Sequence, residues 1–362
     1  FLFRMRNQRT TGYTVIGTMS LDPFDIIENS PLIQSVRKVI EAFGFIQPVH
    51  IKHHHRTEGS MLTDGGKNLL HAGKTPADNV IFLLTLAAIV KAVDDYQDLL
   101  RISVAYAGND HRLGAAEAPP AIMSTFLGDE LTEILDAIER GEHGENKKAE
   151  KVVTGVEVLP DFKKDTTDRN RTSPFAFTGN KFEFRMVGSS FSIAGPNVVL
   201  NTAIAESLKQ FADELEPQKA NFTAALNKLI KSTIKKHKRI IFNGNGYGED
   251  WFKEAEKRGL LNLRTTPDAL PQFIDEKNIE LFTSHKVLTK TEMQSRYEIH
   301  LENYCKVLNI EANTMVSMAK KYIFPSVTAY IKDLSNTINE VKSAVPKANV
   351  NAEQKLVEGL SK

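Results

Sequence analysis

The sequence predicts an α+β protein in which a small antiparallel sheet is backed by helices and followed by an α-helical C-terminal region. Phenylalanines alternate around a turn between residues 175 and 185, as in a β-hairpin. From residue 197 onwards, apolar residues recur three and four positions apart, which is typical of packed helices. The chain has 362 residues, so we expect one large or two modest domains.

Composition excludes several classes of protein. The 46 Lys and Arg residues balance 45 Asp and Glu residues, which argues against a nucleic-acid or membrane-surface partner. The strongest apolar run, Val80 to Val90, is too short to span a bilayer. Because Cys305 is the single cysteine, an internal disulfide is excluded, and we expect this residue to pack in a helix. The chain begins at Phe1 without a signal sequence, so we expect a fragment of a cytoplasmic protein, with an organellar leader upstream left open.

The first half of the chain mixes helical and extended patterns. Residues 34 to 42 are helical in spacing and residues 49 to 52 extended, whereas residues 1 to 34 match no pattern. Residues 76 to 105 predict a long helix with Asp78 as its cap, and residues 125 to 140 predict an amphipathic helix. We expect a solvated loop at 141 to 151 and a strand at 152 to 159.

The hairpin carries the first candidate site. Thr178 to Asn180 supply the turn, and Glu183 and Arg185 then share one strand face opposite the phenylalanines. At about 3.3 Å per residue, their Cα atoms lie roughly 6.6 Å apart, so a carboxylate and a guanidinium stand side by side. Such a pair suits a metal-bound phosphate, although two charges on a strand face are also common as solvated surface residues.

The second half predicts successive helices. Their ranges are 197 to 215, 217 to 236, 248 to 258, 289 to 308 and 310 to 345. Thr289 and Glu292 form a capping-box pattern for the fourth, and Pro325 predicts a bend in the fifth.

Three motifs together resemble a known family. They read NDHRLGAAEAPPAI at 109 to 122, DRNRTSPFAFTGNKFEFR at 168 to 185 and SIAGPNVVLNT at 192 to 202. In this order they are similar to the catalytic half of the large type III glutamine synthetases, over residues 62 to 332. The resemblance implies a partial catalytic region at 35 to 215, a helical region at 216 to 362 and an unassigned segment at 1 to 34. It also implies ligation of ammonia to glutamate through a γ-glutamyl phosphate, with ATP, Mg or Mn, in a homo-oligomeric ring.

The resemblance assigns roles to charged residues of the hairpin segment. It implies that Glu183 binds the metal and that Arg185 contacts the transferred phosphate as a catalytic residue. Arg171 and Lys181 would bind the nucleotide phosphates.

The Asn109 to Pro120 segment supplies two further residues. Gly114 indicates a flexible loop, in which Arg112 would grip the α-carboxylate of glutamate by resemblance. Glu117 would lie on a flap that closes the site and would take the ammonium proton, although a loop glutamate is ordinarily only solvated. For His111 we favour a hydrogen-bonded structural histidine over a ligand or base.

The sequence departs from the family pattern at two places. Residues 51 to 62 lack the glycine-rich turn and its metal-binding histidine, and we interpret His53 to His55 as a solvated loop because alternate strand side chains point apart. The run Asn243 to Gly246 is interpreted as a loop before a helix. The family's other metal carboxylates lie upstream, which leaves two alternatives: a non-catalytic assembly subunit, or a ligase that joins an amine to the γ-glutamyl group.

Overall fold

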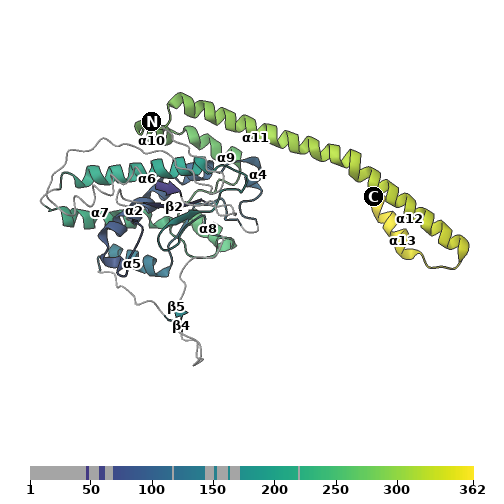
Figure 1. Cartoon of the computed structure of the whole chain (residues 1–362), viewed down its shortest axis with the longest axis horizontal. Coiled ribbons are helices and arrows are strands. Elements are labelled where there is room, and N and C mark those ends of the chain that lie inside the picture. The colour runs from purple at the N-terminus through teal and green to yellow at the C-terminus, as the bar shows by residue number, and fades with distance from the viewer. Residues whose placement is uncertain are drawn as a thin grey trace. The chain divides into compact units, whose positions relative to one another are not determined.

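The computed structural model describes residues 46–48, 57–61, 68–115, 118–142, 151–152, 162–163, 172–218 and 221–362. In 46–48, 57–61, 151–152 and 162–163 it describes the backbone alone. These residues form a predominantly helical structure with a small sheet (Figure 1).

The α-helices are α2 (Val80–Asp95), α3 (Gln97–Ile102), α4 (Ala107–Asp110), α5 (Asp129–Arg140), α6 (Ala194–Leu215), α7 (Phe222–His237), α8 (Glu249–Lys257), α9 (Thr266–Ala269), α10 (Glu276–Ser284), α11 (Lys290–Met318), α12 (Phe324–Ala344) and α13 (Asn351–Leu360). Shorter 3-10 or π turns are η2 (Pro76–Asp78), η4 (Lys238–Ile240), η5 (Leu270–Ile274) and η6 (Ala319–Ile323). Among the described residues, no helix is long and apolar enough to cross a membrane.

The strands are β1 (Ile46–Pro48), β2 (Thr57–Met61), β3 (Thr125–Phe126), β4 (Lys151–Val152), β5 (Phe162–Lys163), β6 (Phe175–Phe177) and β7 (Phe182–Phe184). Five of them form a sheet in the order β1-β2-β7-β6-β3, and β4 pairs with β5 separately. Because β3 runs parallel to β6, this sheet is mixed, whereas the sequence predicted an antiparallel one.

The long helix expected at 76 to 105 is divided into three pieces. Asn79, and not Asp78, caps α2, because its side-chain oxygen accepts a hydrogen bond from the Phe82 amide at 3.1 Å. The backbone leaves helical geometry at Tyr96, where φ is −120°, before α3 begins. The amphipathic helix expected at 125 to 140 begins only at Asp129 as α5, because residues 125 and 126 form β3.

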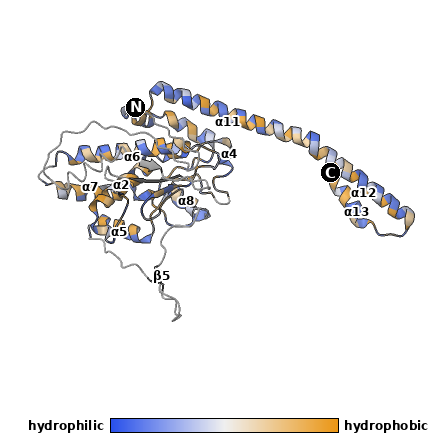
Figure 2. Ribbon diagram, viewed as in Figure 1, coloured by the Kyte–Doolittle hydropathy of each residue, from blue (hydrophilic) through white to orange (hydrophobic). Residues whose placement is uncertain are grey.

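The central helix α2 fills the core. Twelve of its sixteen residues are buried, and it packs against α6 and α7. In Figure 2, orange residues are frequent where α2, α6 and α7 lie together. Each fully buried leucine or isoleucine contributes roughly 1.5–3 kcal/mol, so this helix is a principal source of the stability of the unit.

The predicted hairpin is confirmed. Phe175 pairs with Phe184 and Phe177 with Phe182, and the amide of Thr178 donates to the Lys181 carbonyl at 2.9 Å. Gly179 has a φ of +92°, a left-handed conformation that glycine adopts without strain. The Phe175 and Phe182 rings stack with centroids 4.5 Å apart.

The remaining helices largely follow the sequence pattern. Helices α6, α7 and α8 match the expected ranges within a few residues at most ends. The capping box is also present: the amide of Glu292 donates to the Thr289 hydroxyl at 3.2 Å, and the amide of Thr289 donates to the Glu292 carboxylate at 2.8 Å.

Contacts divide the chain into a unit ending at Leu301 and a second unit, Glu302–Lys362. The second unit holds the end of α11, then η6, α12 and α13. Its π-helical turn lies just before Pro325, whose ring lacks an amide donor and crowds the preceding turn. Cys305 is exposed here, so the prediction that it packs in a helix interface is wrong.

Apolar residues of the second unit are mostly exposed. Val350 is the one buried residue of this unit. Its exposed large apolar side chains are Ile310, Met315, Val316, Met318, Tyr322, Ile323, Phe324, Tyr330, Val341, Val345, Leu356 and Leu360. In Figure 2, orange residues recur along α11 and α12. This unit therefore has almost no core of its own.

Candidate active site

Glu183 and Arg185 form a buried ion pair at the end of β7. Their exposed fractions are 5% and 8%. Both the Nε and the Nη2 of Arg185 lie 3.1 Å from Oε2 of Glu183. The shared strand face is confirmed, and the alternative of two solvated surface charges is wrong. Because burying an ion pair has a desolvation cost that packing alone would not require, the pair is a candidate for function.

A second carboxylate residue occupies the strand beside Glu183. In the register of β2 and β7, Glu58 is directly opposite Glu183, and Ala176 of β6 is opposite it on the other side. The register therefore places the backbone of Glu58 directly beside that of Glu183.

Arg112 reaches the same strand end from α4. Its Nη1 donates to the Met186 carbonyl at 3.1 Å and to Oδ1 of Asn109 at 3.2 Å, and its Nη2 donates to the Arg185 carbonyl at 3.3 Å. The guanidinium of Arg112 thus adjoins the backbone of the residue that pairs with Glu183. By count, its Nε–H and one Nη2–H have no partner among the described residues, which leaves two donors for an anionic ligand.

Arg112 is half-buried, and that burial lowers the pKa of its guanidinium, while the charge of the Tyr247 phenol acts in the opposite direction. An arginine nonetheless remains a cation at neutral pH. The site therefore offers a partly desolvated positive charge, which binds a carboxylate more strongly than an exposed one does.

Asn109 positions this arginine, and sequence reasoning missed it. The side chain is 1% exposed, and its Nδ2 donates to the carbonyls of Val104 at 2.8 Å and Met186 at 3.1 Å. It thereby fixes the start of the Arg112 loop against the end of β7. The signal in the sequence was the spacing, because Asn109 lies three positions, about one helical turn, before Arg112.

The loop after Arg112 closes on itself. The amide of Gly114, at a φ of +80°, donates to the Pro119 carbonyl at 2.9 Å. The carbonyl of Ala115 also accepts from the amide of Ala118 at 3.3 Å. Glu117 lies outside the described residues, so its flap role stays a prediction.

The other predicted site residues fall in different places. Lys181 follows the hairpin turn, partly exposed and two residues before Glu183. Arg171 lies outside the described residues, directly before the buried Thr172. His111 is exposed, and its imidazole has no hydrogen bond to another described residue, so its interpretation as a hydrogen-bonded histidine is unsupported. His53 to His55 also lie outside the described part of the chain.

A third segment packs against the site. Asn243 to Gly248 form a loop before α8, which confirms the loop predicted at Asn243 to Gly246, and the amide of Gly246 donates to the Thr172 hydroxyl at 3.0 Å. A Cβ on Gly246 would be 2.8 Å from the Thr172 carbonyl and 3.4 Å from Cδ of Pro120. The backbone of this loop therefore lies between the end of the Arg112 loop and the residue after Arg171, a position that the sequence pattern did not reveal.

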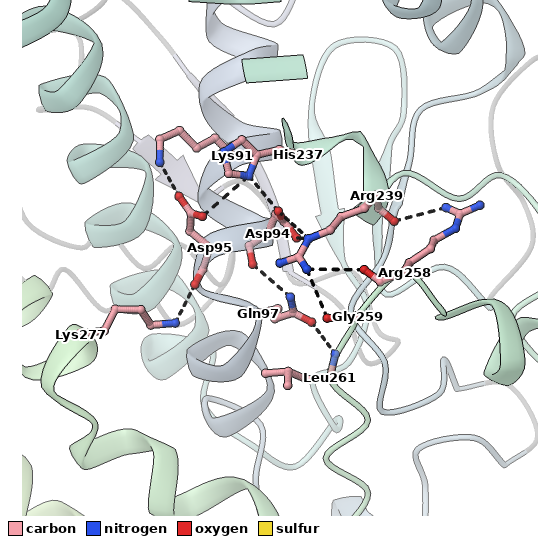
Figure 3. A network of polar contacts seen from close by, with 10 residues as sticks. All are labelled: Lys91, Asp94, Asp95, Gln97, His237, Arg239, Arg258, Gly259, Leu261 and Lys277. Carbon is pink, nitrogen blue, oxygen red and sulfur yellow. Dashed lines mark hydrogen bonds and ion pairs between the residues drawn. The ribbon is translucent and has the colours of Figure 1, made fainter. Parts of the chain in front are cut away.

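A separate polar cluster joins α2 to the end of α7 (Figure 3). Asp94, Asp95 and His237 are the one group of three possible metal ligands within the described residues. Their ligand atoms already have partners, because Nδ1 of His237 lies 2.8 Å from Asp94, Nε of Arg239 lies 2.9 Å from Asp94, and Lys91 pairs with Asp95. A metal would have to displace these contacts, so we interpret the cluster as a structural network.

The same network extends to the segment after α8. The Arg239 side chain donates to the Gly259 carbonyl at 3.3 Å, and the amide of Leu261 donates to the Gln97 side chain at 2.8 Å. Lys277 donates to the backbone carbonyl of Asp95 at 2.7 Å. Of these contacts, drawn as dashed lines in Figure 3, the last two join residues that are more than 100 positions apart in sequence.

Comparison with known proteins identifies relatives over most of the chain. Residues 225–342 match the family model of the glutamine synthetase C-terminal domain. The chain is 47% identical over 284 residues to a type-3 glutamine synthetase of Dictyostelium discoideum, which covers 78% of this chain and 39% of that protein. It is 43% identical over 330 residues to a glutamine synthetase of Butyrivibrio fibrisolvens, covering 87% of this chain and 46% of that protein.

A third relative, a glutamine synthetase of Bacteroides fragilis (strain YCH46), is 36% identical over 327 residues, which are 87% of this chain and 45% of that protein. The chain thus spans less than half the length of the curated relatives it matches. With the converging arginines and the buried carboxylate described above, these similarities show that the chain belongs to the glutamine synthetase family.

Proposed function

We propose that this chain supplies the phosphate-binding and glutamate-binding half of an ATP-dependent ligase that joins ammonia to glutamate. The observation that supports the proposal most directly is the convergence of Arg112 with the Glu183–Arg185 pair at one end of β7. Forming an amide from a carboxylate requires one cavity that holds both an amino acid and a transferable phosphate. Two arginines beside one buried carboxylate provide the charges for such a cavity.

Each residue has a separate task in this proposal. Arg112 binds the α-carboxylate of glutamate with its two remaining N–H groups, and Arg185 binds the transferring phosphate. Arg171 and Lys181 hold the other phosphates of ATP. Glu117 closes the flap over the site and takes a proton from the attacking ammonium.

A divalent cation at Glu183 would share the carboxylate with Arg185, whose Nε and Nη2 both contact Oε2. Carboxylate oxygen is a preferred ligand of Mg²⁺ and Mn²⁺. Bound at this point, the ion would neutralise phosphate charge. The protein itself orients the glutamate carboxylate and excludes water.

The wider proposals concern organisation and location. We assign catalysis to residues 35–215 and a supporting helical role to 216–362, and we place the protein in the cytoplasm. The exposed apolar side chains of the second unit support assembly into a homo-oligomer, because large exposed apolar patches mark interaction surfaces.

The test measures binding first and turnover second. Calorimetry would follow ATP binding to the purified chain with Mg²⁺ or Mn²⁺, and glutamate binding with a non-hydrolysable ATP analogue present. Phosphate release with glutamate and ammonia would then be assayed on the chain and on the complete product of its gene. The control for Glu183→Gln is Glu142→Gln, which makes the same change at a glutamate whose side chain is 58% exposed.

We expect Glu183→Gln to abolish the metal dependence of ATP binding, and Arg112→Gln to weaken glutamate binding at least tenfold with ATP binding retained. Retained ATP binding without turnover in the complete gene product would favour an assembly subunit. Metal-dependent ATP binding at the wild-type level in Glu183→Gln would refute the metal role.

A further inference from the structure

The loop Asn243 to Gly248 is held rigidly beside the proposed site. At its start, the Phe242 amide donates to the Thr125 carbonyl at 2.9 Å, which extends the edge of the sheet. Oδ1 of Asn243 accepts from the amides of Leu127 and Gly128 at 3.1 Å each, and its Nδ2 donates to the Thr132 hydroxyl at 2.9 Å. Both polar atoms of this side chain are thus used to fix the loop to the start of α5.

The far end of the loop is equally constrained. Gly246 fits between Thr172 and Pro120 with no room for a side chain. Asn245 then forms a turn, because its Oδ1 accepts from the Tyr247 amide at 3.0 Å and its carbonyl from the Gly248 amide at 3.4 Å. After the turn, Trp251 of α8 is buried, and its ring stacks on Phe242 with centroids 3.7 Å apart. The loop therefore presents its tip in a fixed position.

Tyr247 is at that tip. It is 39% exposed, although it directly follows a glycine packed against two site segments. Gly246, the residue before it, packs against Pro120, at the end of the loop that begins at Arg112 and closes through the Gly114–Pro119 hydrogen bond. A partly exposed aromatic ring with a polar end, at the tip of a fixed loop that borders the Arg112 loop, is well arranged to contact a bound anion.

We propose that the Asn243–Gly248 loop forms a third side of the amino-acid site and that Tyr247 is a positioning residue there. Its hydroxyl donates a hydrogen bond to the carboxylate that Arg112 binds, and its ring covers that carboxylate from solvent. The ligand class is an α-amino acid carboxylate. This inference rests on the proposed function, because it takes Arg112 as the carboxylate-binding residue.

The chain contains its own probe for the test. Trp251 is its single tryptophan and packs at the base of the loop, so its emission reports ligand binding at the tip. L-glutamate would be titrated into the full chain in the presence of Mg²⁺ and a non-hydrolysable ATP analogue, and the analogue would be titrated separately. The variants are Tyr247→Phe, Arg112→Gln and the control Tyr330→Phe, which removes the same hydroxyl from a tyrosine that is 49% exposed in the second unit.

We expect Tyr247→Phe to raise the Kd for glutamate about tenfold, which corresponds to one hydrogen bond to a charged group. Its Kd for the ATP analogue and its thermal midpoint should stay at the wild-type values, a split that a merely structural role would not produce. Tyr330→Phe should change none of the three. A wild-type Kd for glutamate in Tyr247→Phe, with a weakened Arg112→Gln, would overturn the Tyr247 role alone. If the wild-type chain binds no glutamate, or if Arg112→Gln binds it normally, the proposed function fails as well.

Discussion

Replacing Asp110 by asparagine should destabilise the fold through Arg101. The Arg101 side chain is 1% exposed, and its Nη2 donates to Oδ1 of Asp110 at 2.9 Å. Burial lowers the pKa of Arg101, and Asp110 opposes that shift. Asp110 also accepts from the amide of Thr266 at 2.6 Å and from its hydroxyl at 2.9 Å.

The magnitude follows from what an asparagine side chain cannot do. One oxygen of the Asp110 carboxylate faces Arg101 and the Thr266 hydroxyl, and the other faces the Thr266 amide. Whichever way the substituted side-chain amide is turned, its NH₂ group meets a donor. The charge of Arg101 also remains buried without its counterion, and its Nη1 already has no partner among the described residues. Breaking a buried pair of this kind costs about 3–5 kcal/mol, so we expect a loss of about 3 kcal/mol.

Urea unfolding followed by Trp251 fluorescence would measure this loss. The matched control is Glu142→Gln, because Arg140 and Glu142 are 2.8 Å apart, nearly the same distance, with side chains 59% and 58% exposed. That solvent-exposed pair should contribute nothing measurable to stability.

Losses that are equal for Asp110→Asn and Glu142→Gln would refute the reasoning, because burial would then have no effect on the strength of an ion pair. A second check is the double variant Asp110→Asn with Arg101→Met. Removing both charges should recover part of the loss, since the buried cation is then gone.

Two further predictions concern pH and packing. The hydrogen bond from His285, at 2.6 Å, lowers the pKa of Glu206 from 4.5 to about 2. Because the pKa is lower in the folded state, the ionised Glu206 stabilises the fold by about 1–2 kcal/mol after solvent screening; this stabilisation is complete above about pH 4.5 and is lost as the pH falls towards 2. Glu206→Gln should therefore make the free energy of unfolding depend less steeply on pH in acid. If the wild type and this variant lose stability in parallel below about pH 4.5, the assignment is wrong. Gly246→Ala should lower the free energy of unfolding by about 1–3 kcal/mol, whereas Gly248→Ala, whose Cβ would be 3.6 Å from the nearest atom, should change it little; equal midpoints in urea for the two variants would contradict the close approach at Gly246.

Local patterns were sufficient to predict the hairpin and most helices. Alternation of phenylalanines with Gly179 between them determined the face of Glu183, because side chains of a strand alternate. The break at Tyr96 and the late start of α5 could not be predicted, because both depend on tertiary contacts. Residues 125 and 126 join the sheet only where β6 and the Thr125–Ile241 bridge lie beside them.

Burial of the site residues was also beyond the sequence pattern. The sequence pattern of a glutamate and an arginine two residues apart is the same whether the strand face is exposed or buried. The pair is covered because neighbouring segments, including the Arg112 loop, pack over the end of β7. The packing of the Tyr247 loop against the site was likewise beyond the sequence pattern, since Tyr247 is 135 positions from Arg112 in the sequence.

The motif Asn109 to Arg112 combines structural and functional residues in a single helical turn. Asp110 holds the start of α9, and Asn109 holds the end of β7, so the backbone between them is fixed from two sides. Arg112 extends from that fixed backbone towards the Glu183–Arg185 pair. A guanidinium placed in this way loses less entropy when it binds a ligand than one on a mobile loop does. It follows that loosening the distant Thr266 contact should weaken glutamate binding at Arg112, although Thr266 contacts no residue assigned to the site.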